Sequence, residues 1–209
     1  MTETVQRDPV TFGRTTKTLC TLWNKDASRR WAVRAVDSLF RSRTNGNVMR
    51  TLPVGLVCNP RMAAAEAQRV LAFTHFDPAA GDCCAAVSTA AAVLLAGGER
   101  EDALAAARNA AGRTDLFSDD LIPSVDAVEA IRCAFFFFRQ AASVRDCIEQ
   151  VATLGGGTDT IAAIAGGLAG AYFGMEKYTK RVGVPDRYPE TYCSVYGALT
   201  SARDATRRV

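Results

Sequence analysis

The sequence lacks the patterns that mark several common classes of protein. Its seven cysteines include no C-x-x-C pair, and His75 is its only histidine. The cysteines therefore indicate reduced core residues rather than a disulfide framework. No stretch approaches the roughly 18 consecutive apolar residues of a membrane span, and the N-terminal MTETVQRDPV has no secretory apolar core. We expect a cytoplasmic protein that does not associate with a membrane.

A strong excess of charge of either sign is also missing. The net charge is +3, and the basic residues are spread along the chain rather than gathered in one long run. Nothing in this pattern demands nucleic acid as a partner. The 209 residues are 48% apolar, enough for one domain with a substantial core. Residues 1–13 are polar and aperiodic, so we expect an N-terminal arm there and a single helical domain over 14–209.

Apolar spacing predicts an all-α fold. Residues 26–40 repeat apolar side chains at about 3.6-residue intervals, and alternating strand-like segments are lacking. The loop at 44–47 contains Asn45-Gly46, which favours a sharp left-handed turn. Ser124 is expected to begin a helix that is buried almost all round, because it contains four successive phenylalanines. The other expected helices cover 61–74, 80–96, 99–111, 161–174 and 189–203.

The stretch 154–174, LGGGTDTIAAIAGGLAGAYFG, is the most informative part of the sequence. In one interpretation, three glycines end a helix, Thr158 or Asp159 caps the next, and small residues let helices pack closely. In the other, the Asp159 carboxylate and the Thr160 hydroxyl are oxygen ligands for magnesium. The residues alone favour the packing interpretation, because helix caps are far commoner than metal sites.

This stretch closely resembles the C-terminal motif of the ADP-ribosylglycohydrolase family, Gly-Gly-Asp-Thr-Asp-Thr followed by a small-residue helix. Three further segments match the family in the right order: TNGNVMRTLP at 44–53, THFDP at 74–78 and GRTT at 13–16. Together the matches extend from about Asp8 to Gly174. The resemblance implies a compact orthogonal multi-helix bundle of this family's type, lacking the N-terminal helices.

The resemblance also implies a site. Asn45, Gly46 and Asn47 would lie on the ribose side of the substrate with His75, Gly156 and Gly157, and Asp159 and Thr160 would be metal ligands. Each segment has a plainer interpretation as well: Asn45-Gly46 as a turn, and His75 as a cap on its helix. Convergence of Asn45 and His75 near Asp159 would favour the ligand site, because a turn and a cap have no reason to meet.

The chain departs from the family at the metal site. Active members resemble one another in holding two Mg²⁺ ions through an N-terminal Thr-Asp-Asp-Thr motif and the later Asp-x-Asp-Thr motif. The first motif is absent here, and Gly157 stands where the second has its first aspartate. One carboxylate and one hydroxyl displace too little of the water shell of Mg²⁺ to hold it. We therefore expect no two-metal centre.

These observations predict an ADP-ribosylglycohydrolase-like protein with impaired catalysis. By resemblance, its substrate would be the glycosidic bond between ADP-ribose and a protein side chain, and its cofactor Mg²⁺. The alternative is a pseudoenzyme: a non-catalytic ADP-ribose-binding or scaffold subunit of a larger assembly. Its partners would be ADP-ribose or an ADP-ribosylated protein, and a second chain could complete the fold.

Overall fold

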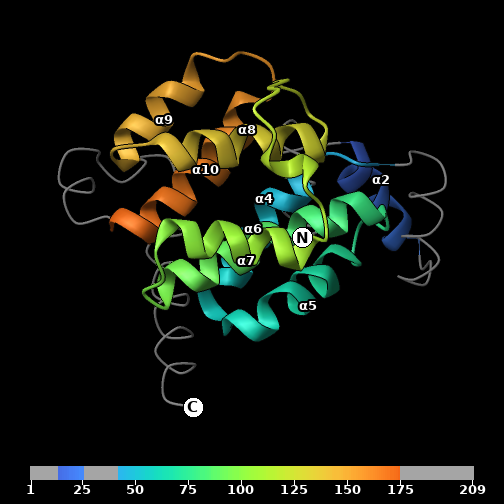
Figure 1. Ribbon diagram of the computed structural model, residues 1–209. Coiled ribbons are helices and arrows are strands. Elements are labelled where there is room, and N and C mark those ends of the chain that lie inside the picture. Colours follow the sequence, from blue (N-terminus) through green and yellow to red (C-terminus); the bar gives the residue numbers. More distant parts are fainter. Residues whose placement is uncertain (1–13, 26–41, 175–209) are drawn as a thin grey trace, which may run out of the picture.

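The computed structural model describes residues 14–25 and 42–174, and the regular elements in this part of the chain are all helices. The helices expected at 26–40 and 189–203 and the arm at 1–13 lie outside the described residues. Among these residues there is no strand, only an isolated bridge between Thr44 and Asp126. The predicted all-α fold is confirmed. The elements, shown in Figure 1, are α2 (Arg14–Trp23), α4 (Gly46–Val57), α5 (Pro60–Leu71), α6 (Pro78–Leu95), α7 (Arg100–Ala111), the 3-10 turn η1 (Asp115–Phe117), α8 (Ala127–Gln140), α9 (Val144–Ala152) and α10 (Thr158–Phe173).

Helix α6 is the centre of the fold, and it packs against α4, α5 and α7. Its sequence is rich in alanine, so partner helices can approach its backbone closely. The tightest approach is at Gly55 of α4, where an added Cβ atom would lie 2.2 Å from the carbonyl oxygen of Ser88. The small residues of α4 and α6 therefore set the distance between the two helices.

By length and composition, α6 is also apolar enough to cross a membrane. However, 72% of its 18-residue window is buried against the other helices. A core helix of a folded domain passes the same test, and burial of this extent is what a core helix shows. In the described part of the chain, α6 is the one helix that meets this criterion.

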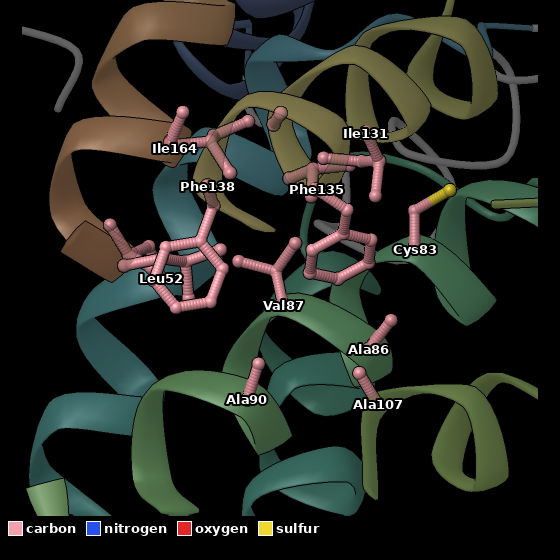
Figure 2. Packing of buried hydrophobic residues seen from close by; sticks show 14 of the residues in the cluster. Leu52, Cys83, Ala86, Val87, Ala90, Ala107, Ile131, Phe135, Phe138 and Ile164 are labelled. Carbon is pink, nitrogen blue, oxygen red and sulfur yellow. The ribbon is translucent and has the colours of Figure 1, made fainter. Parts of the chain in front are cut away.

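The second half of the core lies between α6 and the group α8, α9 and α10, which Figure 1 shows on the opposite side of α6 from α5. Figure 2 shows Phe135 and Phe138 pointing from α8 toward Val87 of α6. The expected burial of all four phenylalanines was wrong, because Phe136 and Phe137 are half-exposed. Helix α8 therefore buries one face and leaves the other at the surface.

Side-chain caps define where several helices begin. Asp77 accepts a hydrogen bond from the N–H of Ala80 at 2.9 Å, and Pro78 occupies the first turn of α6. Asp126 caps α8 in the same way through the N–H of Val128 at 2.9 Å. The sequence had indicated a start at Ser124, but helix α8 begins at Ala127.

The cysteines of the described residues are all free thiols, and all except Cys58 are buried. Burial raises the pKa of the Cys84 thiol to about 11, so this thiol is neutral at physiological pH. The free, mostly buried thiols agree with the prediction of reduced core cysteines.

Candidate functional site

The candidate site is built around the short segment 42–45, which enters α4. The N–H of Asn45 donates to the carbonyl of Val125 at 2.8 Å, and the N–H of Ala127 donates to the carbonyl of Arg43 at 2.8 Å. Residues 43–45 are thereby paired with the residues that lead into α8. This pairing joins two regions about 80 residues apart and holds the start of α4 beside the start of α8.

Asn45 does not form the sharp turn that its sequence suggested. Its backbone is right-handed, with φ −68°, and Gly46 begins α4 without a positive φ. The Asn45 side chain is 5% exposed and donates from Nδ2 to the carbonyl of Ser124 at 3.3 Å. It therefore points toward the segment before α8 rather than capping its own helix.

The glycine loop before α10 reaches the same place. Gly155 and Gly156 have positive φ angles of 75° and 65°, a left-handed backbone that favours glycine. A Cβ atom added to Gly156 would lie 2.4 Å from the carbonyl oxygen of Pro123. One added to Gly157 would lie 2.7 Å from the carbonyl oxygen of Ser124 and 3.2 Å from Nδ2 of Asn45. Asn45 and the glycine loop thus meet across Ser124, although more than 100 residues separate them in the sequence.

His75 is joined to the same segment through a hydrogen-bonded network. Its Nε2 lies 3.1 Å from the hydroxyl of Ser42, which lies 3.2 Å from the hydroxyl of Thr44. Its Nδ1 lies 2.7 Å from the hydroxyl of Thr74, which also accepts a hydrogen bond from Arg50. The imidazole is 4% exposed, so it offers little surface to a ligand. Its clearest role in the structure is to fix the segment before Asn45.

The remaining predicted residues lie at the starts of α4 and α10. Asp159 is exposed in the first turn of α10, and its carboxylate accepts a hydrogen bond from the N–H of Thr160 at 2.7 Å. Thr160 is half-buried. Asn47 is 1% exposed, and neither polar atom of its side chain has a hydrogen-bond partner among the described residues. The ligand roles of all these residues stay predictions.

These residues do not fit a magnesium ion. Within 14–25 and 42–174, no group of three or more His, Cys, Asp or Glu side chains is placed to hold a metal. At Gly157, the position of the missing aspartate, the backbone is closed against Ser124 and Asn45 and leaves no room for a side chain. Magnesium needs near-octahedral oxygen coordination. The Asp159 carboxylate and the Thr160 hydroxyl do not supply it.

The site combines positive helix starts with carboxylates. The starts of α4, α8 and α10 lie together through the contacts of Asn45, Ser124 and Gly157. Each start carries a partial positive charge and N–H groups without partners inside the helix. An open pocket beside them is lined by Arg43, Thr44, Asp77, Val125 and Asp126. Arg43 pairs with Asp126 at 2.6 Å, and this hydrogen bond raises the pKa of the guanidinium.

Sequence reasoning missed several residues of this site, namely Ser42, Arg43, Ser124 and Asp126. Ser42 carried no local signal and Ser124 was expected only as a helix start, because their roles in the site depend on segments far away in the sequence. Asp126 could have been found: an aspartate followed three residues later by Glu129, just before an apolar run, is typical of a helix start.

Comparison with known proteins identifies the family and a similar fold. The sequence model of one protein family, described as ADP-ribosylglycohydrolase, matches residues 2–192. A solved structure titled "ADP-ribosylglycohydrolase-related protein complex" is similar to this chain, with a TM-score of 0.64 and 19% sequence identity. The similarity covers 97% of this chain and 78% of that one, and at this identity it shows a shared fold. No curated protein matches significantly.

Proposed function

Because the chain belongs to the ADP-ribosylglycohydrolase family, we propose that it recognises ADP-ribosylated protein and hydrolyses the bond to ADP-ribose weakly or not at all. Family membership supports the hydrolase class and ADP-ribosylated substrates as ligands. The finer part of the proposal is that substrate binding is retained while the metal-dependent step is impaired. Asn45, Gly156 and Gly157 would face the ribose, with Gly46 and Asn47 at the start of α4.

The single observation that supports impaired catalysis is the closed backbone at Gly157. An aspartate there would place its Cβ 2.7 Å from the Ser124 carbonyl oxygen. The loop has therefore packed into the space that a metal ligand would occupy. Asp159 and Thr160 would bind Mg²⁺ only weakly, because the helix start at α10 also repels a cation. Without the ion, the polarisation and activation of water that it supplies in such enzymes are lost.

The proposal that ADP-ribose binding is retained is supported by backbone N–H groups and side-chain contacts that need no metal ion. The starts of α4 and α10, which have no side-chain cap, offer backbone N–H groups and partial positive charge that suit the two phosphates of ADP-ribose. The contacts of Asn45 with Ser124 and of His75 with Ser42 fix this arrangement in advance of binding. A site whose parts are held in place loses less entropy when a ligand binds.

The alternative function is a non-catalytic subunit that binds ADP-ribose or serves as a scaffold within an assembly. The same closed loop at Gly157 supports it, because a binder needs no metal. A partner chain that completes the site belongs to this alternative. We propose a cytoplasmic location, without membrane or nucleic acid, for either function.

Calorimetry with ADP-ribose, in the presence and absence of Mg²⁺, tests the proposal. We expect ADP-ribose to bind and Mg²⁺ to change the affinity by less than about threefold, which corresponds to under ~1 kcal/mol. Asn45→Ala should weaken binding by about tenfold, because it removes the side chain that joins the start of α4 to Ser124 beside the glycine loop. Asn59→Ala is the matched control, since Asn59 also precedes a helix but caps α5.

Equal ADP-ribose affinity in the Asn45→Ala and Asn59→Ala proteins would contradict the placement of the site. A marked gain in affinity on adding Mg²⁺ would show that a metal site forms after all. A wild-type protein that binds no ADP-ribose would leave only the scaffold function.

A further inference from the structure

A second pocket lies between α7 and α8, and its volume is about 130 Å³. Residues of α7 that are one and two turns apart share one face of the helix and line one side: Glu101, Leu104, Ala105 and Arg108. The other side is lined by residues 135, 136 and 139 of α8, and residues 117–119 complete the lining. The candidate site uses the starts of α4, α8 and α10, so the two places have no residue in common.

The walls of this pocket are largely aromatic. Phe117 and Phe135 stack with their ring centroids 5.0 Å apart. Phe135 is buried, whereas Phe117 and Phe136 are half-exposed and offer ring surface to the pocket. A hollow of this volume with apolar walls holds a single aromatic ring. It is too small for ADP-ribose, because ligands of that size occupy pockets of roughly 300 Å³ or more.

The charges around the pocket are not all paired. Arg139 forms an ion pair with Asp119 at 2.5 Å, so these two side chains balance each other. The guanidinium of Arg108 lies over the ring of Phe117, 4.6 Å from the ring centroid. In the described part of the chain, no carboxylate forms an ion pair with Arg108. The contact with Phe117 therefore holds a cation at the pocket with hydrogen-bond donors to spare.

Glu101 is the remaining charge of the lining. It precedes Arg108 by seven residues, which places it two turns away and about 10 Å along the axis of α7. Glu101 is exposed, so water and salt screen its repulsion of an anion at Arg108. The pocket therefore has a positive end at Arg108, with aromatic surface beside it.

We propose that this pocket binds a small aromatic acid, with the ring between Ala105 and Phe136 and the carboxylate on Arg108. The planar guanidinium suits a carboxylate because its N–H groups can donate to both oxygens. A neutral ring would fill the same space but leave these donors without an acceptor. The proposal goes beyond the proposed function, because no residue assigned to ADP-ribose takes part.

Two-dimensional NMR of the full chain, titrated with benzoate, tests the proposal. We expect a Kd of about 1 mM, which is ordinary for so small a ligand. The shifted amide signals should belong to residues 104–108, 117–119 and 135–139. Benzamide, which keeps the ring but not the charge, should bind at least about tenfold more weakly. N-acetylphenylalanine, which imitates the C-terminus of a protein, should also bind more weakly because the pocket holds one ring only.

Two variants separate the carboxylate from the ring. Arg108→Gln should weaken benzoate about tenfold and leave benzamide unchanged, because only the acid uses the charge. Ala105→Leu should weaken both, because the larger side chain occupies the space of the ring. Both residues are exposed, so the melting temperature should stay that of the wild type. Arg61→Gln is the matched control, because Arg61 is an exposed arginine of α5, outside the pocket.

Several results would overturn the inference: no benzoate binding, shifts confined to other residues, equal affinity for benzamide, or affinity unchanged in Ala105→Leu. Tighter binding of N-acetylphenylalanine would assign the pocket to a protein C-terminus and overturn the assignment to a free acid. Saturating ADP-ribose should leave the benzoate Kd unchanged, and competition between the two would overturn the inference as well. If benzoate binds as expected and ADP-ribose does not bind, the proposed function fails and this pocket stands.

Discussion

Replacing Gly55 by alanine will destabilise the protein by about 3 kcal/mol or more, the upper end of the cost of overpacking a core. The new Cβ atom would lie 2.2 Å from the Ser88 carbonyl oxygen and 2.8 Å from the Cβ of Ala91. Neither can rotate away, because one is backbone and the other is attached to it. The α4 and α6 helices would have to separate, and the core on both sides of α6 would open with them.

Thermal or urea unfolding of Gly55→Ala measures this cost, and Gly46→Ala is its control in the same helix. An alanine at Gly46 meets nothing within 4 Å, so the free energy of unfolding should change by less than about 1 kcal/mol. If both variants unfold at the temperature of the wild type, the close contact between α4 and α6 is not present in solution.

Replacing Phe135 by alanine will cost about 3–5 kcal/mol of unfolding free energy, as expected for a phenylalanine removed from a packed core. Phe135 is 2% exposed and stacks on Phe117, with ring centroids 5.0 Å apart and an interplanar angle of 10°. The cavity would lie between α8 and α6, where Figure 2 shows the ring facing Val87. Urea unfolding of the variant measures the loss.

Phe136→Ala is the matched control for this substitution. Phe136 is the next residue of α8, but it is half-exposed, so its loss should cost about 1 kcal/mol. Equal costs for the two variants would mean that α8 is buried almost all round, as its sequence first suggested, and that Phe136 does not face the surface.

The fold class was predictable from the sequence because apolar spacing identifies an amphipathic helix without knowledge of its partners. Gly112 illustrates a local signal that was sufficient: it follows α7 with a φ of 62°, as a glycine after a helix usually does. The four phenylalanines show the limit of this reasoning. A run of apolar residues does not reveal which side faces the core, because that depends on where α6 and η1 lie.

The candidate site was predictable only in part. The order of the family motifs was visible in the sequence, and it pointed to Asn45 and to the glycine loop that the structure brings together. The backbone at Asn45-Gly46 was mispredicted, because pairing with residues 125–127 outweighed the preference of Asn-Gly for a left-handed turn. The site roles of Ser42 and Ser124 had no signal in the sequence, since their partners come from other parts of the chain.

The burial of Arg50 beside Thr74 was also hidden in the sequence. An arginine in a helix is usually exposed or paired with a carboxylate one turn away. Burial beside Thr74 and a neutral thiol becomes visible only when α4 is seen against α6 and the end of α5. The absence of metal ligands, in contrast, was visible at once, because Gly157 replaces an aspartate in a motif with fixed spacing.

The most direct test of the account is the rate at which the protein releases ADP-ribose from an ADP-ribosylated arginine peptide in saturating Mg²⁺. We predict a rate no more than about tenfold above the rate without protein, because no described set of residues holds the metal that activates water. The same preparation should bind ADP-ribose, which shows that it is folded. Rapid, magnesium-dependent release of ADP-ribose would contradict the account.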